Sequence, residues 1–178
     1  MNFFKNYFLY RVYNKEINYN ERPPRRKFSD KIRNIAVILD GNLVIPEDLF
    51  LNLGSAFGLS RGKIFMLTYS ELKNNNKVVF SNGIFCKSDI SFLGKFNNIL
   101  DKFCSKRYDV LINYYNRNFL PMKLVSLRCK SRISLGFPNV DHRLNDLILN
   151  IDITDNPLFL SESEKYLKLI YSGFSEKN

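Results

Sequence analysis

A strand–helix–strand pattern near the start of the folded region constrains this chain more than any other feature. Residues 35–39 (IAVIL) form a continuous apolar run that ends in an Asp-Gly turn, as expected of a strand buried on both faces. Pro46 suits the first turn of a helix, and residues 49–57 then place their apolar side chains on one face. Residues 63–70 (KIFMLTYS) follow as a second strand. A unit of this length is typical of a parallel crossover and predicts an α/β fold.

The rest of the chain continues this alternation. The apolar patterns predict further strands over 77–82, 83–91, 108–115, 132–137 and 144–152, with an Asn-Gly hairpin turn at 82–83. They predict helices over 97–106 and 121–129, and a last helix that begins at a capping box formed by Ser161 and Glu164. We therefore predict one Rossmann-like, three-layer domain with a mostly parallel sheet over residues 34–178. A basic, aromatic helix and a linker precede it, over residues 1–33.

The N-terminal segment crowds aromatic side chains between charges. Lys5, Arg11 and Lys15 exclude a signal peptide and a membrane-spanning helix. We expect a helix that packs on the domain through its aromatic rings, with peripheral binding of residues 1–15 to a membrane or to RNA as the alternatives. One broad arc of this helix holds Phe3, Phe4, Tyr7, Phe8 and Val12.

Positive charge is unevenly distributed along the sequence. The 27 Lys and Arg residues exceed the 17 acids and give a net charge of +10. Residues 1–33 and 101–144 each carry +6, whereas 34–100 carry +1 and 145–178 carry −3. Such blocks suit nucleic acid, an anionic membrane surface or an acidic protein, and solubility alone is an equal explanation. The candidate nucleic-acid contacts are Arg25, Arg26 and Lys27 in a linker that follows two prolines, and Lys130 and Arg132 in the second block.

Several kinds of site are excluded by what the sequence lacks. A single His removes the usual catalytic zinc sites, and three cysteines without a CxxC pair argue against a structural zinc site or a disulfide framework. Neither a dinucleotide-binding GxGxxG nor a P-loop occurs. We therefore expect no metal, no cofactor and no conventional catalytic set. The cysteines read as small buried side chains in a reducing, cytoplasmic compartment.

A ligand site is nevertheless expected where the parallel strands end. Asp40 and Asn42 follow the first strand, Arg117 follows strand 108–115, and His142 and Arg143 follow strand 132–137. Two arginines with a His at one edge of a sheet suit a phosphate group. The alternative is that the basic side chains of this region only solvate the exposed face of a helix.

Asp40, Gly41 and Asn42 form a motif that is similar to the opening motif of cis-prenyltransferases, in which the Asp handles a diphosphate and its magnesium. Leu43-Val44-Ile45 replaces the Gly-Arg-Trp that this family has next, and the chain is short for that family. An Asp-Gly turn at the end of a strand is also common. We therefore lean against an enzyme.

Residues 108–151 carry a second resemblance. Their strand (YDVLINYY), short helix, strand ending in Gly-Phe and Asp-x-Arg-Leu segment resemble an uncharacterised Bacteroidota family, a domain of unknown function. A looser similarity runs to the amino-terminal half of heptosyltransferase-like glycosyltransferases, whose two Rossmann-like halves hold a nucleotide sugar. The chain has room for one such half, which implies a lost reaction or a separate partner.

Together these patterns predict a non-catalytic cytoplasmic α/β protein that binds a polyanion, with RNA or a ribonucleoprotein as the first expectation. The alternative is a domain, related to glycosyltransferase halves, that binds a small phosphorylated ligand such as a sugar phosphate, a nucleotide or a diphosphate.

Overall fold

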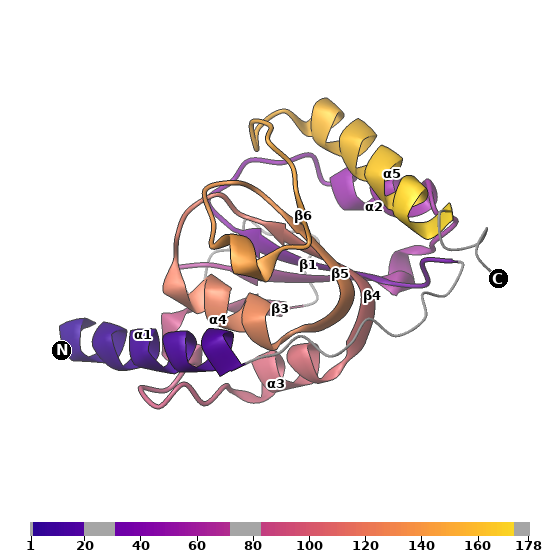
Figure 1. Ribbon diagram of the computed structural model, residues 1–178. Coiled ribbons are helices and arrows are strands. Elements are labelled where there is room, and N and C mark those ends of the chain that lie inside the picture. The colour runs from indigo at the N-terminus through magenta and orange to yellow at the C-terminus, as the bar shows by residue number, and fades with distance from the viewer. Residues whose placement is uncertain (1, 20–30, 72–82, 173–178) are drawn as a thin grey trace.

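A computed structural model describes residues 2–19, 31–71 and 83–172 of the chain. Its centre is one six-stranded sheet in the order β3-β2-β1-β4-β5-β6, with every neighbouring pair parallel (Figure 1). This is the strand order of the doubly wound Rossmann fold, so the predicted fold class is confirmed. The strands are β1 (Ile35–Asp40), β2 (Ile64–Tyr69), β3 (Gly83–Phe85), β4 (Arg107–Tyr114), β5 (Lys130–Gly136) and β6 (Leu147–Ile148).

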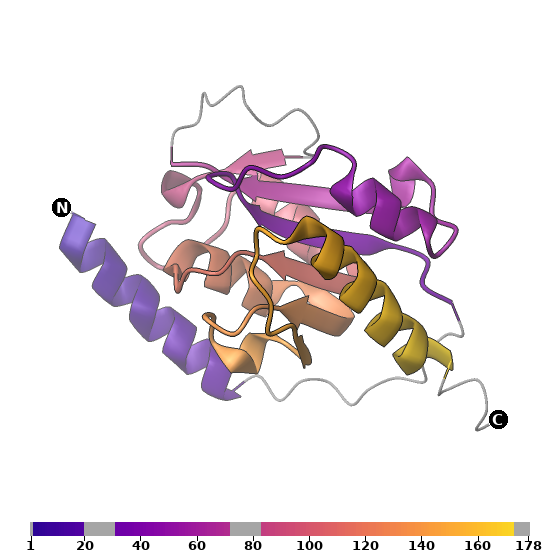
Figure 2. The ribbon, with the colours of Figure 1, turned by 90° about the horizontal axis from the view of Figure 1, so that it is seen from above.

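Helices cover both faces of the sheet and make three layers (Figures 1 and 2). One face is covered by α1 (Asn2–Tyr19), α3 (Asn98–Ser105) and α4 (Leu120–Arg128), and the other by α2 (Leu49–Ser55) and α5 (Asn156–Ser172). Successive side chains of a strand point to opposite faces, so β1 feeds both cores. Ala36 and Ile38 pack toward α4, whereas Ile35, Val37 and Leu39 pack toward α2 and α5.

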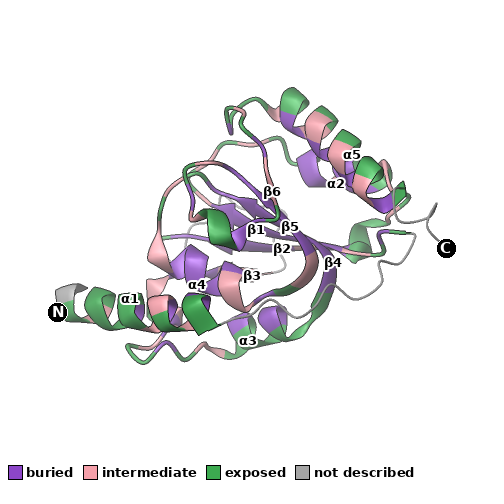
Figure 3. Cartoon of the chain, in the orientation of Figure 1, coloured by how far each residue is buried: buried purple, intermediate pink, exposed green. Residues whose placement is uncertain are grey.

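The two central strands are apolar along their length because water reaches neither of their faces. All six residues of β1 are buried, as are the last seven of β4 (Figure 3). The sequence predicted both strands from their continuous apolar runs. Because β1 and β4 are buried on both faces, their ends are held in place, and so are the loops that follow them and carry polar side chains.

The N-terminal helix docks by a different face from the one predicted. Leu9, Tyr13 and Ile17 are the buried side chains of α1, which packs on α4. Phe4 and Tyr7, which belong to the predicted aromatic arc, are 72% and 52% exposed. The helix packs on the domain as predicted, and Tyr13 is a buried ring of it, but the predicted arc is not the docking face. The i, i+4, i+8 row of Leu9, Tyr13 and Ile17 forms a narrower stripe that packs on α4.

Three element boundaries also differ from the sequence prediction. Helix α5 begins at Asn156 with Pro157 in its first turn, so Ser161 lies inside the helix and its hydroxyl donates to the carbonyl of Leu158. Helix α2 begins at Leu49 rather than at Pro46, and the last predicted strand is reduced to the two residues of β6. Gly83 opens a strand parallel to β2, while the predicted strand 77–82 lies outside the described residues.

Cys86, Cys104 and Cys129 are free thiols and are buried, as the sequence predicted. The sulfur atoms of Cys104 and Cys129 lie 3.4 Å apart between α3 and the start of β5. Burial raises the pKa of the Cys129 thiol, so the neutral form is favoured there. None of the helices in the described residues is both long enough and apolar enough to cross a membrane.

Candidate functional site

The topological switch point of the sheet lies between β1 and β4, where ligands of doubly wound folds bind. These strands are neighbours, and their ends come together in the register that pairs Leu39 with Tyr114. Asp40 closes β1, and Arg117 follows β4 by three residues. The topology thus brings together two of the residues that the sequence singled out.

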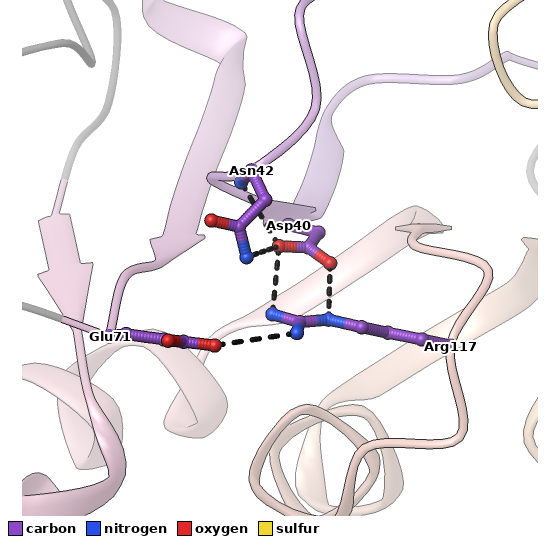
Figure 4. Close-up of polar contacts among 4 residues, drawn as sticks. All are labelled: Asp40, Asn42, Glu71 and Arg117. Carbon is purple, nitrogen blue, oxygen red and sulfur yellow. Dashed lines mark hydrogen bonds and ion pairs between the residues drawn. The ribbon is translucent and has the colours of Figure 1, made fainter.

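Asp40 and Arg117 form a two-point ion pair at this edge (Figure 4). Arg117 Nε lies 2.5 Å from Asp40 Oδ2, and Arg117 Nη2 donates to Asp40 Oδ1 at 3.1 Å. Arg117 Nη1 also lies 3.5 Å from Glu71 Oε1. The Asp40 side chain is only 6% exposed, whereas that of Arg117 is 38% exposed. The guanidinium therefore compensates a buried carboxylate and reaches water along its outer edge.

The residues after Asp40 complete a tight turn. The backbone N–H and the side-chain amide of Asn42 both donate to Asp40 Oδ1, each at 3.1 Å. Gly41 donates its N–H to the carbonyl of Tyr69 at 2.8 Å, and a Cβ atom on Gly41 would lie only 2.5 Å from that oxygen. A glycine is required here by the close approach of β2. The turn therefore accounts for each residue of the Asp-Gly-Asn motif.

The guanidinium of Arg117 lies over two aromatic rings. The Arg117 guanidinium carbon lies 4.9 Å from the centroid of Phe119 and 5.8 Å from that of Tyr69. Burial, and then the neighbouring Glu71, raise the pKa of Tyr69 to about 12, so its hydroxyl keeps its proton. Within the described residues, no three His, Cys, Asp or Glu side chains gather into a metal site. With Arg117 already bound to one or two carboxylates, the switch point offers an anion little uncompensated positive charge.

His142 and Arg143 lie in another group, on the short helix η3 (His142–Leu144) beside α1. Arg143 binds both oxygens of Asp141, at 2.9 Å and 2.7 Å, and also donates to Asn18 Oδ1 on α1. Arg143 lowers the pKa of Asp141 well below its usual value through these hydrogen bonds. The exposed His142 ring nitrogen contacts the carbonyl of Pro138 at 2.8 Å.

The opposite edge of the sheet collects positive charge. Four adjacent strands, in the spatial order β2-β1-β4-β5, each have two cations in their first three residues or in the four residues before them. We call these eight side chains the basic edge: Arg61 and Lys63, Lys31 and Arg33, Lys106 and Arg107, and Lys130 and Arg132. Arg107 and Lys130 are direct partners in the register of β4 and β5. All eight are exposed except Arg132, which is half-buried.

Few acids lie in the described stretches that form the basic edge. Within 31–34, 61–64, 106–109 and 130–133, the single acid is Asp109, whose Oδ1 lies 3.1 Å from Arg132 Nε. Its other oxygen accepts the backbone N–H of Arg33 at 2.7 Å. Helices α2, α3 and α4 also end at this edge, but a helix C-terminus carries only about half a negative charge. Within these described stretches, cations therefore outnumber acids by eight to one.

Comparison of the sequence with models of protein families identifies the family of this chain. Residues 5–170 match the model of a family of unknown function, DUF6913. The chain belongs to this family. No curated protein and no solved structure matched it.

The sequence identified part of the basic edge of this DUF6913 chain. Lys130 and Arg132 were predicted as nucleic-acid contacts and lie on it, whereas Arg25, Arg26 and Lys27 fall outside the described residues. The prediction missed the other six cations: Lys31, Arg33, Arg61, Lys63, Lys106 and Arg107. Their common signal is a pair of cations at the start of each central strand or within the four residues before it, because parallel strands bring their beginnings to one edge.

Proposed function

We propose that this protein is a non-catalytic polyanion-binding domain whose ligand is RNA, alone or in a ribonucleoprotein. The observation that carries this proposal is the basic edge, where two cations precede or open each of four neighbouring strands. The two +6 blocks of the sequence meet there, since Lys31 and Arg33 come from the first and Lys106 to Arg132 come from the second. A cytoplasmic location is part of the same proposal.

The spacing of the basic edge suits a phosphate backbone. Neighbouring strands lie about 4.8 Å apart, so four strand starts span about 14 Å. Arginine and lysine side chains reach phosphates several ångströms from their backbone, and phosphate contacts bind without reading the base sequence. We therefore expect binding that depends on charge and on backbone shape more than on sequence.

Salt dependence of binding tests this proposal. Affinity for a structured RNA, measured by fluorescence anisotropy over a series of salt concentrations, should fall steeply because each neutralised phosphate releases counterions. For four to six contacts we expect a slope of log K against log salt of about −3 to −5. The absence of binding at low salt, or an affinity independent of salt, would contradict the proposal.

A small phosphorylated ligand at the switch point is the weaker candidate, and the kinship with glycosyltransferase halves is proposed only with it. The position fits, because Arg117 lies at the edge where such folds bind ligands. The charge of Arg117 does not suit such a ligand, because Asp40 already binds its guanidinium at two points. We expect sugar phosphates, nucleotides and diphosphates, with or without magnesium, to leave the melting temperature unchanged. A rise in melting temperature that Arg117→Met abolishes would instead favour this second function.

A further inference from the structure

The outer face of α1 is the main exposed apolar surface that the described residues form. Among the described residues, eleven large hydrophobic side chains are exposed, and seven of them lie on α1 or on the loop at 91–96. Six of these, which we call the aromatic face, are Phe4, Tyr7, Phe8, Tyr19, Phe92 and Leu93. The rings of Tyr7, Phe8 and Phe92 contact one another, and a cluster of exposed apolar side chains is typical of an interaction site.

Helical geometry directs this face away from the protein. Phe4, Tyr7, Phe8 and Arg11 follow one another at intervals of three, one and three residues and share a side of the helix. The opposite side holds Leu9, Tyr13 and Ile17, which are buried against the domain. Because the helix is anchored by that second side, the aromatic side chains stay in water in the free protein. In Figures 1 and 2 the N-terminal half of α1 projects past the body of the domain, and Figure 3 shows its outer surface as exposed.

The loop at 91–96 is held against the helix and extends the face. The rings of Phe8 and Phe92 pack edge to face with centroids 6.3 Å apart. Gly94 has φ +78°, and a Cβ atom there would lie 2.9 Å from Val12 Cγ1, so only glycine lets the loop approach α1 this closely. Arg128 Nη1 also donates to the carbonyl of Gly94 at 2.5 Å. The face is therefore built from two fixed elements.

Cations lie among and beside the side chains of the aromatic face, and the acid of α1 is turned away from them. Arg11, Lys15 and Lys95 are exposed. The single acid between residues 4 and 19 is Glu16, which is bound by Arg128 Nε at 2.8 Å and Nη2 at 2.6 Å on the side facing α4. An aromatic surface with cations among and beside its side chains complements a flat anionic surface with an apolar layer beneath it.

We propose that α1 and the loop at 91–96 form a docking surface for an anionic phospholipid membrane. Phenylalanine and tyrosine rings enter the boundary between headgroups and acyl chains, and the flanking cations bind the anionic headgroups. The protein would lie on the bilayer by this face without crossing it. The basic edge is a different surface, so this inference stands independently of RNA binding.

A membrane fits this face better than two other occupants. A second copy of the chain would bring the same cations against Arg11 and Lys15, and each copy carries +10. RNA bases stack best in a groove whose walls position them, whereas this face is the convex surface of a helix. A bilayer is flat, anionic and soft enough to admit the protruding rings.

Vesicle binding by the full chain tests the proposal. We expect co-sedimentation with vesicles of phosphatidylcholine mixed with phosphatidylserine, and much weaker co-sedimentation with phosphatidylcholine alone. The variant Phe4→Ser/Phe8→Ser/Phe92→Ser should reduce partitioning by roughly tenfold or more, since each exposed ring contributes apolar burial in the interface. The charge variant Arg11→Gln/Lys15→Gln/Lys95→Gln should lose the preference for phosphatidylserine.

A matched control removes three exposed hydrophobic side chains elsewhere. Val44→Ser/Leu158→Ser/Leu169→Ser should bind vesicles like the wild type. These side chains are 93%, 39% and 65% exposed, but they lie between β1 and α2 and on α5, on the other side of the sheet from α1. Circular dichroism confirms that each variant is folded. The proposal is overturned if the wild type does not bind anionic vesicles, or if both triple serine variants bind equally. It is also overturned if the aromatic variant instead abolishes a concentration-dependent dimer or the binding of RNA.

Discussion

At the scale of single residues, the main role of the polar side chains at the switch point is to stabilise the fold rather than to bind a ligand. Asp40 is buried in the sheet edge, and Arg117 supplies the counter-charge that makes such burial tolerable. Asn42 adds two hydrogen bonds to the same carboxylate. This arrangement holds the ends of β1 and β4 together and leaves the guanidinium little capacity for a ligand.

Substitution of Arg117 by methionine keeps the packing on Phe119 and removes the charge. We expect the free energy of unfolding to fall by about 2 kcal/mol, less than for a fully buried pair because a third of Arg117 is exposed to water. Urea denaturation measures this change. Asp40→Asn/Arg117→Met should recover part of the loss, because an amide needs no counter-charge. A single variant as stable as the wild type would show that the pair is not structural.

Gly136 packs against a row of buried polar side chains that are linked by hydrogen bonds, and a substitution there tests this packing. Tyr115, Ser126, Asn113 and Asn145 are linked by hydrogen bonds of 2.7 Å, and a Cβ atom on Gly136 would lie 2.4 Å from Asn145 Nδ2. We expect Gly136→Ala to cost about 2–4 kcal/mol, because Asn145 cannot move without breaking these hydrogen bonds.

Gly62→Ala is the matched control for this variant, since a Cβ atom there meets nothing within 4 Å. Its effect on the unfolding free energy should stay within about 0.5 kcal/mol. Equal melting temperatures for the two alanine variants would contradict the described packing of Asn145.

At the scale of elements, one buried polar cluster fastens α1 to the domain. Tyr13 on α1 donates to Asp141 Oδ2 at 2.8 Å, and Lys123 on α4 lies 4.4 Å from the centre of the Tyr13 ring. Burial lowers the pKa of Lys123, and it raises the pKa of Tyr13 well above its usual range. Asp141 also holds Arg143, so a single carboxylate joins the helix to η3.

Because its folded-state pKa is lowered, Asp141 stabilises the protein at pH values above its usual pKa of 3.8. That contribution is lost as the pH falls below this value. We expect Asp141→Asn to lower the unfolding free energy by about 2 kcal/mol at neutral pH. The difference from the wild type should shrink progressively below about pH 4. Urea denaturation across this range measures it, and a difference that does not change with pH would assign the loss to packing instead.

The sequence predicted the elements best where burial is two-sided. The apolar runs of β1 and β4 have a local cause, so both strands could be predicted from the sequence alone. The face by which α1 packs on the domain could not be predicted in this way, because it depends on the surface shape of α4. Asp40 and Arg117 were identified as neighbours from topology, but their direct pairing is a tertiary contact that no spacing encodes.

At the scale of the whole molecule, charge is arranged along the strand direction. The basic edge lies where the strands begin, whereas Asp40, Glu71 and Asp141 lie where strands end or beyond. The +10 of the sequence therefore becomes an oriented field in the folded protein. Residues 31–33 and 61–63 contribute to it as much as the second basic block, which the linear charge count alone does not reveal.

The most direct test of the basic edge compares two variants that lose the same charge. Arg107→Gln/Lys130→Gln removes a cross-strand pair at the centre of the edge, and Lys95→Gln/Lys165→Gln removes two exposed cations elsewhere. RNA affinity, measured by fluorescence anisotropy, should fall about tenfold for the first variant, and its salt slope should decrease by about 2. The second variant should bind like the wild type. Equal affinities for both variants would contradict a polyanion site at the basic edge.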